Sequence, residues 1–268
     1  MSHLMKNYGR LPVSFDHGQG VWLWDKEGHK YLDALAGIAV NSVGHAHPRL
    51  VRAIADQASK LIHCSNYFNI DLQEQVAEKL VEHSGLEAVF FCNSGLEANE
   101  CAIKIARKFG HAKGIEVPNI IVLKHAFHGR SIATLSATGN PSVRADFSPY
   151  TEGFIFVDES DLDGIRKIVE ENKNVVAIFF EPILGEGGVV PIDLSVIKGI
   201  REICDEHDLL MMCDEVQCGM GRSGKWFAHQ WAEIKPDVIT MAKGLAGGVP
   251  VGAVIVSEKA NIFKPGNH

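Results

Sequence analysis

The chain has 268 residues, of which 46% are hydrophobic and 22% are charged, a composition typical of a soluble globular enzyme. Its net charge of −7 and pI near 6.0 argue against a nucleic-acid partner. No apolar stretch approaches the roughly 20 residues that a membrane-spanning helix needs. The first ten residues lack the apolar segment of a secretory signal, so we expect a cytoplasmic protein.

Cysteine and histidine spacing does not indicate a metal site. The six cysteines contain no CxxC pair, so we expect free buried thiols rather than disulfides or a zinc centre. Thirteen histidines occur without an HExxH pattern, and His45 and His47 lie in a predicted turn. We therefore expect no bound metal.

The N-terminal part is predicted to form a small hairpin followed by two helices. Alternating apolar residues over 20–25 and 29–33 predict two strands joined by a turn. Apolar side chains recur at helical spacing from Pro48 to Ile62, and 71–81 predicts a second amphipathic helix. We assign 1–50 to a segment of a small domain and 51–268 to a large domain.

From residue 88 onward, strands and helices alternate. Helices are predicted at 96–109, from Ser131, at 161–171 and at 194–207. Short apolar runs predict the strands, at 88–92, 119–123, 153–157, 175–180, 209–213 and 237–242. This order predicts an α/β fold, with a mainly parallel sheet and helices on both faces.

Two reactive side chains follow predicted strands. Asp214 ends one apolar run and Lys243 follows another, so both are expected at the carboxyl edge of the sheet, where ligands bind in such folds. Pyridoxal phosphate uses a lysine at its aldehyde and an acidic partner at its ring nitrogen. The alternative interpretation of this pair is a structural salt bridge.

Asn93–Glu100 lies between a predicted strand and a helix and contains Ser94-Gly95-Leu96. Glycine permits close backbone approach, and the first helical N–H groups have no partner within the helix, so a phosphate fits there. The alternative is an ordinary helix cap, with Ser94 and Glu97 forming a capping box.

Two further loops follow predicted strands. Phe127 offers an aromatic ring to a planar ligand, and Arg130 offers a bidentate donor for a carboxylate; the alternative is a core phenylalanine beside a surface arginine. Glu181–Gly188 surrounds Glu186 with glycines, which suggests a carboxylate facing a substrate amine or an arginine. By itself, this segment could be a glycine-rich turn.

Five segments together resemble the class III aminotransferases, a fold-type I group dependent on pyridoxal phosphate. They occur in the family's order, at Asn93–Glu100, Phe127–Arg130, Glu181–Gly188, Asp214–Arg222 and Met241–Pro250, and the similarity covers essentially the whole chain. Gly37–Asn41 and Gly44–Pro48 look most like the acetylornithine aminotransferase branch.

The resemblance implies a role for each cofactor residue. Lys243 is the expected Schiff-base lysine and Asp214 the partner of the pyridine nitrogen. Gln217 is expected to bond the phenolic oxygen, and Phe127 to stack on the ring. The phosphate is expected to be held by three residues, Ser94, Gly95 and Leu96.

The resemblance also implies substrate contacts. Arg130 is expected to bind a substrate carboxylate, and Glu186 matches a gate residue that pairs with a distal arginine. Relatives acting on ornithine carry a tyrosine where this chain has Gly37, so a small residue there suits an acylated donor. Leu184 and Cys218 depart from the family's usual glutamine and threonine.

The resemblance further implies a homodimer and a C-terminal domain that this chain lacks. Family members continue by roughly 120 residues, about one small domain. A threonine and an arginine that contact phosphate and 2-oxoglutarate would lie there. The expected reaction moves the terminal amino group of N2-acetylornithine to 2-oxoglutarate, in arginine biosynthesis.

Several alternatives remain open, because a fold does not determine a substrate. The donor could instead be succinylornithine, succinyldiaminopimelate, ornithine or 4-aminobutyrate. An aminomutase or racemase would also use Lys243 and Asp214, and a non-enzymatic homologue is a further possibility.

Overall fold

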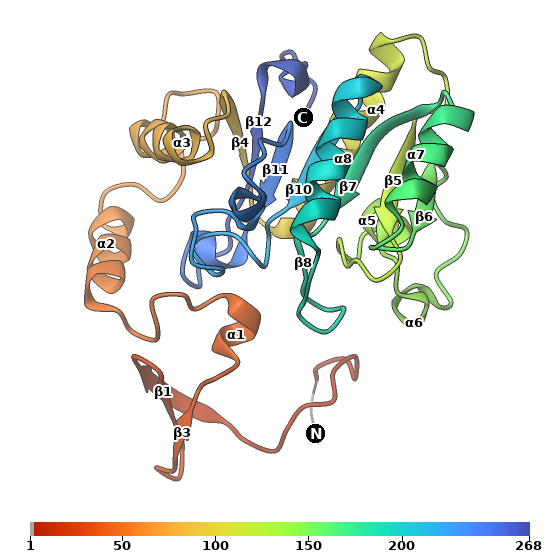
Figure 1. The fold of residues 1–268 in the computed structure, drawn as a ribbon. Coiled ribbons are helices and arrows are strands. Elements are labelled where there is room, and N and C mark those ends of the chain that lie inside the picture. Colours follow the sequence, from red (N-terminus) through yellow and green to blue (C-terminus); the bar gives the residue numbers. More distant parts are fainter. Residues whose placement is uncertain (1–2) are drawn as a thin grey trace. The chain divides into compact units, whose positions relative to one another are not determined.

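The computed structural model describes residues 3–268. The chain forms two compact units, Met1–Ser65 and Asn66–His268 (Figure 1). Sequence analysis set a boundary after residue 50, whereas the structure groups the helix that begins at Pro48 with the first unit. Within residues 3–268, no helix combines the length and apolar character needed to cross a bilayer.

The first unit contains a three-stranded antiparallel sheet. The predicted hairpin is β2 (Trp22–Asp25) and β3 (Lys30–Leu32), and a further strand that was not predicted, β1 (Phe15–Gln19), pairs with β2. The buried Asp25 carboxylate accepts hydrogen bonds from the His29 N–H at 2.8 Å and the Tyr31 hydroxyl at 2.9 Å. These bonds hold the hairpin turn closed.

A single left-handed turn, α1 (Ala36–Ala39), follows this sheet. Its φ angles are +51°, +66°, +63° and +61°, all in the left-handed region. Only Gly37 adopts this region without penalty, and Ile38 is β-branched, so the turn carries backbone strain. The predicted helix α2 (Pro48–Ala58) comes next and begins at its proline.

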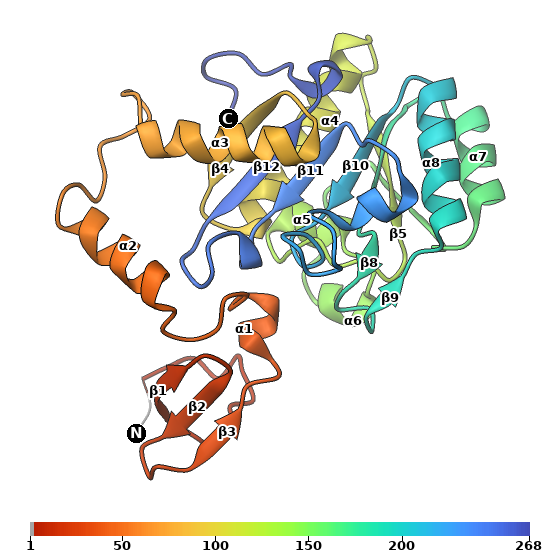
Figure 2. The ribbon, with the colours of Figure 1, turned by 60° about the vertical axis from the view of Figure 1, so that its left-hand side comes forward.

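The second unit is built on a seven-stranded sheet in the order β4-β12-β11-β10-β7-β5-β6 (Figures 1 and 2). Its strands are β4 (Ala88–Cys92), β5 (Asn119–Leu123), β6 (Phe154–Val157), β7 (Val175–Phe180), β10 (Leu210–Asp214), β11 (Val238–Met241) and β12 (Gly252–Val256). A two-stranded hairpin, β8 (Ile183–Leu184) and β9 (Val190–Pro191), follows β7.

The sheet is mainly parallel, as predicted, with one exception. β5, β6, β7, β10 and β11 pair in parallel, whereas β12 runs antiparallel to both β11 and β4. The sequence analysis did not predict β12. The connection from β11 to β12 is a short segment without an α-helix, whereas a parallel connection needs a crossover of a dozen or more residues.

Helices cover both faces of this sheet (Figure 2). On one face α4 (Gly95–Ala112) and α5 (Ile132–Ala137) pack on alternate strand residues; the short α6 (Pro141–Arg144) follows α5. α3 (Asp71–Ser84), α7 (Leu162–Glu171) and α8 (Leu194–Glu206) pack on the opposite face. The predicted fold class is confirmed.

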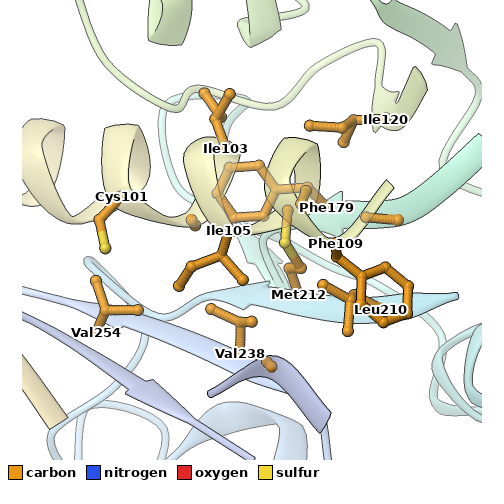
Figure 3. Packing of buried hydrophobic residues seen from close by; sticks show 14 of the residues in the cluster. Cys101, Ile103, Ile105, Phe109, Ile120, Phe179, Leu210, Met212, Val238 and Val254 are labelled. Carbon is orange, nitrogen blue, oxygen red and sulfur yellow. The ribbon is translucent and has the colours of Figure 1, made fainter. Parts of the chain in front are cut away.

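The core beneath α4 is dense and almost entirely apolar. Figure 3 shows Ile103 and Ile105 of α4 facing strand side chains such as Phe179, Met212 and Val238. The side chains of Met211 and Cys213 alternate with these and pack against α7 and α8. Because neighbours on a strand point to opposite faces, Asp214 lies on the α4 face.

Candidate active site

Three ionisable side chains stand at the ends of three adjacent strands. Cys213 of β10 pairs with Phe180 of β7, so Asp214 and Glu181 are the next residues on neighbouring strands. Asp214 in turn pairs with Thr240 of β11, three residues before Lys243. The structure therefore brings Asp214 and Lys243 to one edge of the sheet, with Glu181 beside them.

The Asp214 carboxylate is 2% exposed and hydrogen-bonded at both oxygens. Oδ2 accepts from Asn99 Nδ2 at 2.7 Å and from His128 Nδ1 at 2.8 Å, and Oδ1 accepts from the Val216 N–H at 3.0 Å. A carboxylate has about four lone-pair positions. Three are used, so Oδ1 retains one position for a further donor.

His128 is held in one tautomer by its surroundings. Nδ1 must carry the proton it donates to ionised Asp214, because that carboxylate only accepts. Nε2 is buried and has no partner, so a second proton there would be an orphaned donor. A neutral imidazole, stacked on Phe179 at 4.1 Å, fits this environment. The negative charge of Asp214 is then not cancelled by its neighbours.

Glu181 is buried beside this charge. Its Oε2 accepts from the Phe127 N–H at 2.8 Å and its Oε1 from the Gly185 N–H at 3.2 Å. Burial, followed by the negative charge of Asp214, raises the pKa of Glu181 to about 8. The positive charge of Lys243 opposes this shift.

Lys243 begins a 3₁₀ turn, Lys243–Leu245, directly after β11. Its φ of +43° is uncommon for a residue with a side chain, and strained backbone of this kind is found at functional sites. In the part of the chain that the structure describes, no ion pair joins Lys243 to Asp214. The alternative interpretation of a structural salt bridge is therefore not supported.

The start of α4 lies next to these strand ends. A Cβ added to Gly95 would be 2.6 Å from Val216 Cγ1 and 3.3 Å from the Ala242 Cβ. Leu96 lies against Gly129, in the loop after β5. The Ser94 hydroxyl accepts from the Glu97 N–H at 3.2 Å, so the predicted cap also forms. The predicted phosphate-binding segment is thus adjacent to the residues flanking Gln217 and Lys243.

The remaining predicted residues occupy the loops around this edge. Phe127 is half-buried, and the exposed Arg130 guanidinium lies 5.5 Å from its ring centre. The side-chain amide of Gln217 packs against Gly185, where an added Cβ would displace it. Glu186 is exposed in the β8–β9 hairpin. The structure thus gathers the predicted cofactor residues, whereas Arg130 and Glu186 lie at the surface.

Sequence analysis missed three residues of this site. Asn99 and His128 lie inside segments that were already singled out, and Glu181 directly follows a predicted strand. Their burial could not be read from the local pattern. For Glu181, its position at the carboxyl end of a strand was an available signal.

Comparison with known proteins assigns the family. The family model described as aminotransferase class III matches residues 4–268. The chain belongs to the class III aminotransferases. The predicted family, whose enzymes depend on pyridoxal phosphate, is therefore confirmed.

Individual relatives in the class III family are named for their amino donors. The chain is 54% identical over 269 residues to an acetylornithine aminotransferase from Nitrosomonas europaea, covering 100% of this chain and 68% of that protein. It also resembles the N-acetylornithine aminotransferase structure from Stenotrophomonas maltophilia, with a TM-score of 0.82, 39% identity and coverage of 94% and 64% of the two chains.

A second structure is described with its cofactor. It is an ornithine aminotransferase from Toxoplasma gondii, with partial occupancy of PLP at its active site. The TM-score is 0.93 at 34% identity, covering 99% of this chain and 64% of that chain. The chain therefore spans about two thirds of the length of these relatives.

Proposed function

We propose that this protein is a pyridoxal-phosphate-dependent aminotransferase that moves the terminal amino group of N2-acetylornithine to 2-oxoglutarate. The main supporting observation is a buried, ionised Asp214 with one open acceptor position, next to Lys243 on the adjacent strand end. When bound, pyridoxal phosphate acts as an electron sink for the carbon that carries the amino group.

The residues present fit this cofactor. The open position on Asp214 Oδ1 suits the N–H of a protonated pyridine, and a buried carboxylate favours keeping that proton. Lys243 would hold the cofactor through its aldehyde. Once the substrate amine displaces it, the freed Nζ would move a proton from the substrate carbon to the cofactor.

Other side chains orient the bound molecule. Phe127 would cover one face of the ring, and Gln217 would donate to the phenolic oxygen. The N-terminus of α4, with Ser94, Gly95 and Leu96, would hold the phosphate through backbone N–H groups and the helix dipole. All these residues lie within 51–268, which we therefore propose as the cofactor-binding domain.

Acetylornithine is the preferred donor because about half of the aligned residues are identical in the relatives named for it. Arg130 would hold the donor's carboxylate, and Glu186 would pair with an arginine until the keto acid displaces it. Relatives acting on ornithine carry a tyrosine at the position of Gly37, which also favours an acylated donor for this chain. Ornithine is the second candidate donor, because one of the similar structures is an ornithine aminotransferase.

Lys243→Ala tests the proposed chemistry. The whole protein should acquire the visible absorbance of a lysine-bound cofactor, and the variant should lose it together with amino transfer. Lys259→Ala is the matched control, because Lys259 bonds Leu209 O and Asp208 outside the site. Amino transfer persisting in Lys243→Ala would rule out the proposal.

A panel of donors then tests the substrate. N2-acetylornithine should show the highest kcat/KM with 2-oxoglutarate as acceptor, and Gly37→Tyr should shift preference towards ornithine. Equal rates for both donors before and after that substitution would contradict the role of Gly37.

We also propose a cytoplasmic homodimer. Many large apolar side chains of the first unit and α3 are exposed, which is typical of surfaces that pack against another chain. They include Val51, Ile54, Leu61, Leu72 and Val76. All six cysteines are free thiols, consistent with a reducing compartment. Light scattering of the whole protein should give twice the monomer mass; a monomer mass would contradict the dimer.

A further inference from the structure

Glu181 has no role in the proposed chemistry, yet it is buried at the centre of the site. Its side chain is on the residue that follows β7, and its two carboxyl oxygens accept from two different loops. One donor is the Phe127 N–H, in the loop after β5. The other is the Gly185 N–H, in the β8–β9 hairpin.

Each of these loops positions one proposed cofactor contact. The first carries Phe127 itself. The second loop, the β8–β9 hairpin, supports Gln217. The Gln217 side-chain amide packs against Gly185, in the space that a Cβ on that residue would occupy. Glu181 therefore connects, through two hydrogen bonds, the side chain proposed to cover the ring and the side chain proposed to bond its phenolic oxygen.

We propose that Glu181 is a positioning residue that clamps the two loops, so that Phe127 and Gln217 hold the cofactor ring in one orientation. The proposal rests on the proposed function, because it assigns those two side chains to the ring. It requires both carboxyl oxygens to accept and the full length of the side chain to reach both donors. The raised pKa favours protonated Glu181. A protonated carboxyl group can still accept hydrogen bonds at both oxygens, so both loops remain bonded.

Two other roles would leave different signatures. Asp214 and Lys243 are the charged groups that act on Glu181, so Glu181 could instead influence the site only through its charge. It could also be a core hydrogen bond that affects stability alone. Glu181→Gln removes the titratable group and one acceptor, whereas Glu181→Asp keeps a titratable carboxyl group but is too short to reach both loops.

The experiment measures pyridoxal phosphate itself, by equilibrium dialysis and by the circular dichroism band that the bound cofactor acquires. Both Glu181→Gln and Glu181→Asp should weaken cofactor binding roughly tenfold and alter that band. Glu206→Gln is the matched control, since Glu206 is exposed and pairs with Arg166 on α7. It should behave as wild type in both measurements.

Three results would overturn the clamp. A Glu181→Asp variant identical to wild type, beside an altered Glu181→Gln, would show that only a titratable carboxyl group is needed. Variants with lower melting temperatures but unchanged binding and dichroism would show a purely structural role. Variants indistinguishable from wild type in every measurement would show no role.

Gly185→Ala tests the loop that supports Gln217 without changing Glu181. It provides the deciding test of the clamp if the Glu181 variants do not fold. The added methyl group must displace the Gln217 side chain. The dichroism band should therefore change in the same direction as in the Glu181 variants, and an unchanged band would contradict the clamp. A wild-type protein that binds no pyridoxal phosphate would instead refute the proposed function. A binding wild type with unaltered variants refutes only the clamp.

Discussion

Asp214 is a buried negative charge whose partners are all neutral. A buried charge is costly unless it is compensated, and here three hydrogen-bond donors compensate it in part. The remaining acceptor position on Oδ1 is where a cationic ring nitrogen would complete the set. Cofactor affinity should therefore depend on the residues that hold Asp214, although they do not touch the cofactor.

His128→Phe tests this dependence. Phenylalanine keeps the stacking on Phe179 but removes the donor to Asp214 Oδ2, leaving that oxygen with one bond. We expect a free energy of unfolding lower by about 1–3 kcal/mol and weaker pyridoxal phosphate binding. Thermal denaturation and dialysis measure both. His128→Asn, which can still donate, should lose less; equal losses in the two variants would contradict the hydrogen-bond explanation.

Glu181 should make the stability of the cofactor-free protein depend on pH. Its pKa is raised from 4.5 to about 8, so the folded state binds a proton that the unfolded chain releases. The resulting stabilisation is complete below pH 4.5 and is lost as pH rises towards 8. The free energy of unfolding should fall by up to about 1.4 kcal/mol per pH unit in this window.

Glu181→Gln carries no titrating proton and isolates this contribution. Denaturant unfolding at several pH values should show a shallower decline for the variant than for wild type. Parallel declines would mean that Glu181 has its ordinary pKa in the folded protein.

At the scale of elements, the contact between α4 and the strand ends is close enough to exclude a methyl group. In Gly95→Ala the new Cβ would lie 2.6 Å from Val216 Cγ1, so the helix start must move. We expect destabilisation by about 1–3 kcal/mol and loss of phosphate-dependent cofactor binding.

Two further variants control this prediction. Gly95→Ala combined with Val216→Ala restores space and should recover part of the stability and binding. Gly9→Ala has no atom within 4 Å of the new Cβ and should be neutral. Failure of the double variant to recover either property would argue against the steric explanation.

The left-handed turn α1 should be improved by glycine. Ile38→Gly removes a β-branched side chain at a φ of +63°, so relief of the backbone strain should raise the melting temperature of the protein. Strain of this kind is retained where function needs it, so amino transfer should decrease at the same time. A variant that is less stable than wild type would contradict the strain argument.

Local patterns predicted most elements of the large sheet but not all of them. The helices from Asp71 and Pro48, and the strands ending near Cys92 and Leu123, have clear periodicity and bounding residues. β8 and β9 have two residues each, too few to show a pattern, and the five residues of β1 are mostly polar or glycine. β12 shows an apolar run, Gly252–Val256, but no α-helix separates it from β11, so it falls outside the alternation of strands and helices.

Site residues were predicted where the cofactor chemistry requires a particular residue type. They were missed where a common polar residue has a role only because the fold buries it in the site. Lysine and aspartate after apolar runs are unusual, so Lys243 and Asp214 stood out. Asn99 lies in a helix and resembles any polar helical residue until the structure brings it against Asp214, 115 positions away. Such long-range contacts leave no mark on local spacing.

At the scale of the whole molecule, stability is concentrated in the second unit. Every buried apolar side chain within residues 3–268 lies at Leu80 or beyond. A chain reduced to 66–268 should therefore keep a cooperative unfolding transition, with a melting temperature close to that of the longer chain. Calorimetry of both chains tests this, and a non-cooperative melt of 66–268 would show that the first unit is needed for folding.

The strand register of β10 has a consequence for mutations of its buried apolar residues. Met212 and Cys213 point to opposite faces of the sheet and pin β10 between its two neighbours. A slip by one position would turn the acid at the strand's end away from Asn99 and towards the helices of the other layer. Buried apolar side chains that contact no substrate therefore fix the direction in which the Asp214 carboxylate points. Substitutions that shift the register of β10 would abolish this arrangement without changing any polar residue.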